Sequence, residues 1–142
     1  MQKLRERMTK SEEGFTLIEL LVVMLIIGIL AAIAIPSFFN QREKAQDSDA
    51  KAEARTAQTA METYATDHGG DYDGATQADL LVIEPTLADA TGLTAAGTAT
   101  GYTVTATSAT DRTFSIVKNN NTFSFTCTPD GGGCPSGDWS GD

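Results

Sequence analysis

The chain has 142 residues, of which 41% are hydrophobic, and a net charge of −9. This length accommodates one modest domain together with an anchoring segment. The negative charge argues against strong direct binding of nucleic acid by the monomer, because a phosphate backbone selects basic surfaces.

The N-terminal region combines a basic start with a long apolar run. Between Leu20 and Ile35 no residue is charged. Residues 15–39, as a helix, are long enough to cross roughly 30 Å of hydrocarbon. One acid, Glu19, lies within this apolar segment, where a carboxylate is costly and therefore indicates a function with a cationic partner. Four basic residues precede the run and favour a cytoplasmic N-terminus: Lys3, Arg5, Arg7 and Lys10.

The motif Gly14-Phe-Thr-Leu-Ile-Glu, followed by this apolar run, resembles the N-terminus of type IV pilins and type II secretion pseudopilins. The close resemblance covers about residues 8–66 and includes Pro36 and the polar helix after it. It implies an α+β pilin fold, in which a long N-terminal helix, half of it transmembrane, packs on a small three-stranded antiparallel sheet.

The resemblance also implies processing at Gly14 and Phe15. A prepilin peptidase would cut between them on the cytoplasmic side and remove the leader, residues 1–14, after which Phe15 would be N-methylated. The cut would leave the anchor on the product, unlike cleavage of an ordinary secretory signal. The alternative is an uncleaved single-span anchor. The mature chain would carry a net charge of about −10.

One helix is expected from about Phe15 to Thr66, with a lipid-soluble half over 15–39 and an amphipathic half over 40–66. The second half has one narrow apolar face, expected to pack on the domain: Ala50, Ala54, Ala57, Met61 and Tyr64. Gly28 and Pro36 are the candidate kink positions. We expect a gentle kink in the isolated subunit and local loosening only in a filament.

Residues 67–101 are expected to form the variable αβ-loop of the family, with a short helix in it. Gly69 and Gly70 should end the long helix, because glycine adopts the left-handed conformation. Thr76 should cap the short helix, with Asp79 at its third position. Glu84-Pro85 should end that helix, and a loop should follow over residues 86–101.

The segment 102–142 is expected to hold the sheet and a stapled tail. Alternating apolar and hydroxyl residues predict strands at about 102–108, 112–118 and 122–127. Lys118–Thr122 predicts a hairpin turn, because asparagine tolerates positive φ. Trp139 should pack on the sheet from the tail.

The two cysteines, Cys127 and Cys134, predict a disulfide, given their even number, exported context and short intervening loop. A metal pair is the alternative, although only His68 is available to complete such a site. We expect the bridge to staple the sheet edge rather than to frame an adhesive loop.

Other candidate sites have simpler explanations. Asp130 and Asp138 are candidate calcium ligands because some pseudopilins bind calcium near the C-terminus, but a solvated acidic turn is favoured here and in residues 67–74. Asn120-Asn121-Thr122 fits a glycosylation sequon, and turn chemistry explains it equally. His68 lies in no nucleophile motif. We therefore expect neither a cofactor nor an enzyme.

The resemblance implies a structural function. In a filament, Glu19 would pair with the terminal amine of Phe15 in a neighbouring subunit. The chain would leave the cytoplasmic membrane, as a single-pass protein, to form an extracellular pilus or a periplasmic or cell-wall pseudopilus. Implied partners are further copies of the chain, the prepilin peptidase/methyltransferase, an assembly ATPase, the inner-membrane platform protein and, before assembly, membrane lipid.

Adhesion, twitching motility or DNA uptake would belong to the assembled fibre. The acidic domain does not exclude a small basic patch once subunits are arrayed. One alternative is a pseudopilin of a secretion system or a minor priming subunit. Another class is a membrane-tethered binding module that uses the pilin-like start only for export.

Overall fold

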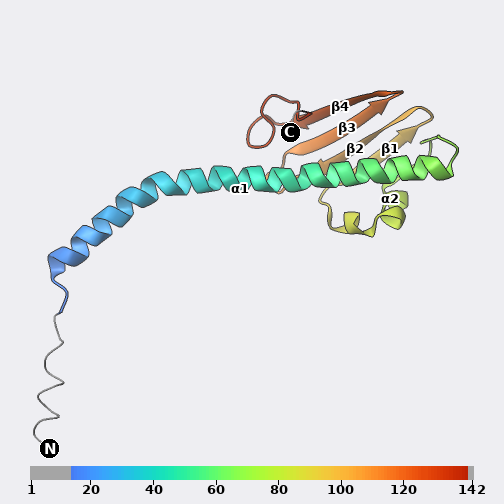
Figure 1. Cartoon of the computed structure of the whole chain (residues 1–142). Helices are drawn as coiled ribbons and strands as arrows, with labels where there is room; N and C mark the ends of the chain where they lie inside the picture. Colours follow the sequence, from blue (N-terminus) through green and yellow to red (C-terminus); the bar gives the residue numbers. More distant parts are fainter. Residues whose placement is uncertain (1–13, 141–142) are drawn as a thin grey trace, which may run out of the picture. The chain divides into compact units, whose positions relative to one another are not determined.

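A computed structural model describes residues 14–140, so the leader lies outside the described residues except for Gly14. The elements in chain order are α1 (Leu17–Asp67), α2 (Gln77–Ile83), the 3-10 helix η1 (Pro85–Asp89), β1 (Thr94–Thr98), β2 (Gly101–Thr107), β3 (Thr113–Asn119) and β4 (Thr122–Thr128). The described chain divides between Phe38 and Phe39 into two units. Figure 1 shows the elements in sequence colours.

The first unit is the apolar part of α1. Its large hydrophobic side chains are exposed, from Leu17 at 77% to Ile35 at 53%. Within the described residues, α1 is the one helix whose length and composition would let it cross a membrane. The helix is continuous through Gly28 and Pro36. Local loosening at these two residues in a filament stays a prediction.

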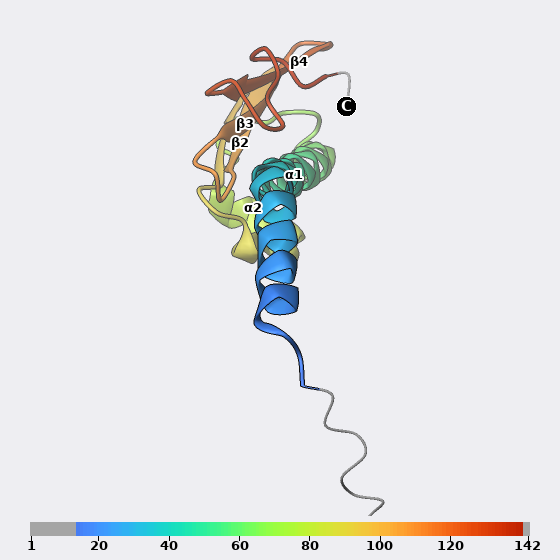
Figure 2. The same cartoon turned by 90° about the vertical axis from the view of Figure 1, so that its left-hand side faces the viewer.

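The second unit packs the remainder of α1 against the sheet. Its helix face consists mainly of alanines, and Ala54 and Ala57 are fully buried. Small side chains let the sheet approach the helix closely, where Val104, Phe114 and Ile116 fill the interface. The expected apolar face is confirmed, although Tyr64 is only partly buried. In Figure 2 the strands and α2 lie on different sides of α1.

The sheet has four antiparallel strands in the order β1-β2-β3-β4. The three expected strands are confirmed within a residue or two as β2, β3 and β4, but the expected total of three strands is wrong, because β1 precedes them. Residues 94–98 were expected to be loop because Thr-Ala-Ala-Gly-Thr has no large apolar residue to alternate. Pairing with β2, from Thr94–Thr105 to Thr98–Gly101, makes them a strand.

Gly97 shows why this strand can form. A Cβ atom at this position would collide with the backbone carbonyl of Tyr72, so the residue must be glycine for β1 to lie against the αβ-loop. An isolated bridge between Thr76 and Ala96 joins the same two segments. Tertiary contact therefore decides this strand, against its weak local pattern.

The start of the αβ-loop, and the cap of the short helix within it, are as the sequence predicts. Gly69 and Gly70 have φ of 68° and 93° and follow the end of α1. Thr76 and Asp79 form a complete capping box at the start of α2. Pro85, expected only to end α2, also starts η1, so the loop expected over residues 86–101 contains a 3-10 helix as well as β1.

The hairpin and the tail are also as expected. Asn120 has φ of 54° in the turn between β3 and β4. Trp139 is 1% exposed, and its ring meets those of Phe114 and Phe125 edge-on. Its Nε1 donates a hydrogen bond to the Thr126 carbonyl at 3.0 Å. The tail therefore closes one end of the core.

Candidate assembly site and the contacts that hold the domain

Glu19 and Thr16 form a capping box at the start of α1. The Glu19 carboxylate accepts hydrogen bonds from the Thr16 backbone N–H at 2.8 Å and from the Thr16 hydroxyl at 2.9 Å. The hydroxyl accepts in turn from the Glu19 N–H at 3.3 Å. Two N–H groups that lack helical partners are thereby satisfied.

This box constrains what Glu19 can do. Both bonds use Oε2, which leaves Oε1 without a hydrogen-bond partner within residues 14–140. Every atom of the box belongs to Thr16 or Glu19, so cleavage between Gly14 and Phe15 would leave it intact. The box was missed in the sequence, although Thr-x-x-Glu is the same type of signal that identified Thr76 and Asp79.

The surroundings of Glu19 are apolar and open. The next charged residue along the chain is Arg42. Phe15 is 90% exposed, and a Cβ atom added to Gly14 would meet no other atom within 4 Å. The peptide bond expected to be cut therefore lies in an accessible segment next to the helix start. Cleavage and N-methylation themselves stay predictions.

A buried carboxylate, Asp47, joins three segments of the second unit. Its side chain is 0% exposed. It accepts hydrogen bonds from the Thr110 hydroxyl at 2.5 Å, the Gly133 N–H at 2.8 Å and Arg112 at 3.2 Å. Arg112 also contacts Glu43 at 3.3 Å. The β2–β3 turn and the loop between the cysteines are thus both attached to α1.

The pKa of Asp47 reflects this arrangement. Burial alone would raise the pKa, but hydrogen bonds from Thr110, Gly133 and Ser108 and the charge of Arg112 outweigh burial, so the pKa lies below its usual value. Asp47 therefore stays ionised while buried. The sequence signal was available: Asp47 continues the spacing of the apolar face, three residues before Ala50.

A second polar cluster surrounds Glu62. Its carboxylate accepts hydrogen bonds from Tyr72 at 2.7 Å, Tyr102 at 2.9 Å and Lys118 at 2.9 Å. The Lys118 ammonium lies 4.8 Å from the Tyr72 ring centre and 5.3 Å from that of Phe123. The cluster ties the αβ-loop, β2 and β3 to α1. No sequence pattern indicated it.

The cysteines form the predicted disulfide, Cys127–Cys134, which replaces the alternative of a metal pair. Its loop is pinned to α1, because Gly133 donates to Asp47 and a Cβ atom on Gly133 would lie 2.7 Å from the Asp47 Cβ. Asp138 accepts from the Ser140 N–H. No group of three or more metal-ligating side chains occurs in the described part of the chain, and Asp130 and Asp138 belong to none.

Two further candidates have structural partners. His68 stacks on Tyr64 at 3.9 Å between ring centres, and its Nδ1 lies 2.8 Å from the Tyr64 carbonyl. Asn120 occupies the left-handed turn position, as turn chemistry requires. Glycosylation there stays untested.

Comparison with known proteins identifies relatives of the N-terminal region. Residues 9–35 match a family model described as "Prokaryotic N-terminal methylation motif". "Type IV major pilin protein PilA" of Myxococcus xanthus (strain DK1622) is 45% identical over 58 residues, which are 41% of this chain and 26% of that protein. A "Fimbrial protein" of Pseudomonas aeruginosa is 40% identical over 87 residues, 58% of this chain and 56% of the relative.

"Type IV major fimbrial protein FimA" of Dichelobacter nodosus is 48% identical over 60 residues, 42% of this chain and 38% of the relative. The matched segments thus span 26% to 56% of the lengths of these relatives. No solved structure is significantly similar to the chain. The chain therefore carries the methylation motif, is similar over its N-terminal part to type IV major pilins and fimbrial proteins, and folds as a pilin-like long helix on a small antiparallel sheet.

Proposed function

We propose that this chain is a prepilin that is cut between Gly14 and Phe15, N-methylated and polymerised into a type IV pilus-like filament. The observation that carries the proposal is the exposed apolar half of α1, in which Glu19 is the single acid between residues 14 and 39. Such a surface would be shielded from water by lipid before assembly and by the same helices of other copies afterwards.

Glu19 supplies the specific contact of the proposed filament. Cleavage would create a cationic amine on Phe15 at the positive end of a helix, where its own helix dipole disfavours it. The carboxylate of a neighbouring copy would neutralise that amine through Oε1, while Oε2 keeps its bonds to Thr16. In an apolar bundle this pairing offsets much of the desolvation of both charges.

The proposal includes partners and location. Before assembly the chain would span the cytoplasmic membrane with its N-terminus in the cytoplasm, and a prepilin peptidase/methyltransferase would process it there. An assembly ATPase and a platform protein would then drive extrusion into an extracellular fibre. Because the relatives named above are major pilins or fimbrial proteins, a major subunit is favoured over a pseudopilin.

Mass spectrometry and electron microscopy of surface material sheared from producing cells test the proposal. The expected material is fibres composed of a chain that starts at N-methylated Phe15. A matched Gly14→Val chain should keep its leader and give no fibres, because the side chain obstructs the peptidase. An intact leader on all the chain, without fibres, would contradict the proposal.

A further inference from the structure

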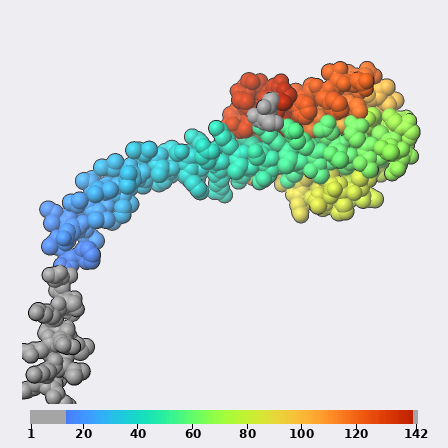
Figure 3. Space-filling view, viewed as in Figure 1, coloured from blue at the N-terminus to red at the C-terminus, as the bar shows by residue number. Residues whose placement is uncertain are grey.

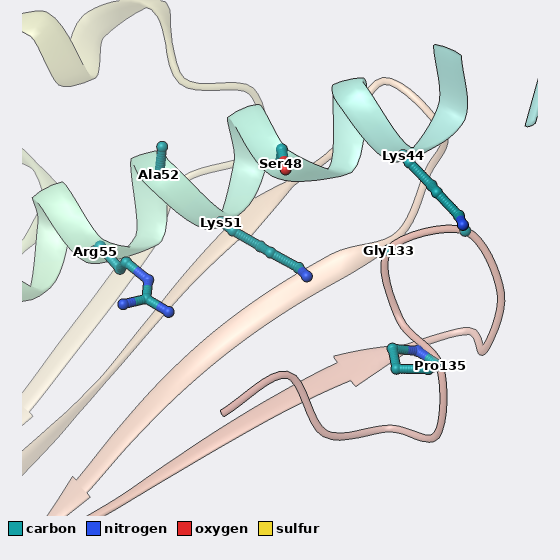
Figure 4. Close-up of a pocket in the computed structure, with 8 residues that line it drawn as sticks. Lys44, Ser48, Lys51, Ala52, Arg55, Gly133 and Pro135 are labelled. Carbon is teal, nitrogen blue, oxygen red and sulfur yellow. The ribbon is translucent and has the colours of Figure 1, made fainter. Parts of the chain in front are cut away.

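The second unit carries a basic groove between α1 and the loop enclosed by the disulfide. It has a volume of about 640 Å³ and is lined by Lys44, Ser48, Lys51, Ala52, Arg55, Gly132, Gly133 and Pro135. Figure 4 shows the side chains of Lys44, Lys51 and Arg55 extending from one side of α1 toward the strands and this loop. Among residues 14–140, no acidic side chain lines the groove.

Aromatic rings of the core hold two of the positively charged side chains of the groove in position. The Lys51 ammonium lies 5.7 Å from the Phe114 ring centre, and the Arg55 guanidinium lies 5.2 Å from that of Trp139. Cation–π contact of this kind orients both side chains along the groove. Lys44, Lys51 and Arg55 are three of the six Lys and Arg residues that follow Phe15 in this acidic chain. We name these three residues the basic flank.

The other side of α1 is acidic at the same level along the helix axis. At about 100° per residue, Asp49 and Glu53 lie roughly 150° around the helix from the centre of the basic flank. Asp89 of η1 is near enough to act on Glu53. Burial, followed by the charges of Asp49 and Asp89, raises the pKa of Glu53. We name Asp49, Glu53 and Asp89 the acidic flank.

The two flanks face different directions. In the space-filling view, the red C-terminal loop lies on one side of the green part of α1, and the yellow segment that contains η1 lies on the other (Figure 3). Two copies placed side by side in the same orientation, with little axial offset, therefore bring the basic flank of one toward the acidic flank of the next.

We propose that, in the filament, the basic groove of each subunit receives the acidic flank of a second copy. The inference rests on the proposed function and names the contact between globular domains that it needs. A head-to-tail contact between two different surfaces propagates into a helical filament instead of closing as a dimer. It also reduces repulsion between acidic subunits and fixes their orientation. A soluble polyanion would explain the groove but would leave the acidic flank without a role.

Charge reversal in the fibre-forming full chain tests this contact. Lys44→Glu with Lys51→Glu makes both flanks acidic, and Asp49→Lys with Glu53→Lys makes both basic. Each variant alone should lower the yield of sheared fibres by about 5-fold or more, as expected for a repeated contact worth near 1 kcal/mol. Co-production of the two variants should restore the yield, because their flanks are again complementary.

A control separates specific pairing from net charge. Thr59→Lys with Thr63→Lys adds positive charge at exposed positions of α1 outside both flanks. This control chain keeps both flanks and should form fibres by itself, so the readout is the amount of the Lys44→Glu, Lys51→Glu chain that enters the fibres. Co-production with the control should bring in less of it than co-production with the Asp49→Lys, Glu53→Lys chain; equal incorporation would overturn the inference. Thermal unfolding in detergent should show each variant folded.

Normal fibre yield from both charge-reversed chains would overturn this inference and leave the proposed function standing. That result is expected if the basic flank pairs only with carboxylates of its own subunit. Absence of fibres from the unmodified chain would overturn the proposed function as well.

Discussion

The two units of this protein share α1 but use it in opposite ways. Up to Phe38 none of the helix side chains that the structure describes is buried, although nearly all are apolar. After Phe39 the helix is polar, yet it buries a row of alanines under the sheet. The difference shows that the most hydrophobic stretch of this chain is not part of its folded core.

Each unit therefore depends on a different environment for stability. The large apolar side chains of the first unit that the structure describes are exposed, so this unit would depend on lipid or on other copies of itself. The second unit depends on packing against its own sheet and on the two ionic clusters around Asp47 and Glu62, which link other segments to α1. Substitutions in the first unit should change assembly and leave folding intact, and substitutions of the buried contacts of the second unit should lower folding stability.

The sharpest test of this division is Glu19→Gln. The amide can still accept the Thr16 hydrogen bonds, so the helix start should persist, while the charge that would neutralise the Phe15 amine is lost. Leaving one buried charge unpaired costs about 3 kcal/mol or more, so fibre yield should fall about 100-fold. Quantification of sheared protein checks this. Unchanged yield, with normal membrane insertion, would refute the pairing.

In the second unit, Asp47→Asn should destabilise folding by about 3 kcal/mol, because it breaks a buried ion pair that attaches the β2–β3 turn and the loop between the cysteines to α1. Denaturant unfolding of the detergent-solubilised chain measures this. Asp49→Asn, the same change at an exposed position two residues later, should be within about 0.5 kcal/mol of the unmodified chain. Similar losses from both substitutions would contradict the role of Asp47.

The same carboxylate predicts a dependence on pH. Because the folded state lowers the pKa of Asp47, its contribution is present above the unfolded-state pKa of about 3.9 and is lost as the pH falls through the folded value. Glu62, also lowered, acts in the same direction. Stability should thus decline below about pH 4, and less steeply in Asp47→Asn. An identical decline in both chains would exclude Asp47 as a cause.

Replacing Cys127 and Cys134 together with serine should cost about 2.5 kcal/mol of folding stability, from the entropy of the short loop that the bridge closes. Fibre yield should change little at moderate temperature, because the first unit is untouched and the loop remains attached to α1 through the hydrogen bond from Gly133 to Asp47. Chemical denaturation and fibre yield, measured on the same preparations, check both parts. A loss of fibres with unchanged stability would place the loop in assembly instead.

The smallest effect is expected from Thr16→Val, which removes the capping hydroxyl at a cost of about 1 kcal/mol. Thr16→Ser keeps the hydroxyl and should behave as the unmodified chain. Assembly should fall several-fold only in the valine variant, since its Glu19 carboxylate loses one of the contacts that orient it. Equal yields from both variants would show that the capping box does not position Glu19.

Features that depend on residues close together in the sequence could be predicted from it, and features that depend on distant residues could not. The long helix, the cap formed by Thr76 and Asp79, the glycines after α1 and the asparagine turn follow from neighbours within a few residues. The disulfide also followed, because its two cysteines are seven residues apart and have no rivals. Cleavage at Gly14, methylation of Phe15 and the pairing of Glu19 come from family resemblance and wait for experiment.

The sequence by itself thus determined the apolar anchor, its acid, the order of elements and most of the strands, because each obeys local periodicity or turn chemistry. Only the tertiary structure decided that Asp47 is a buried residue that links other segments to α1, since its partner Gly133 lies 86 residues away in the sequence. It likewise decided that Tyr102 and Lys118 meet at Glu62, that residues 94–98 form an edge strand and that charges divide into two flanks. These features depend on which segments fold against α1, and no short stretch of sequence contains that information.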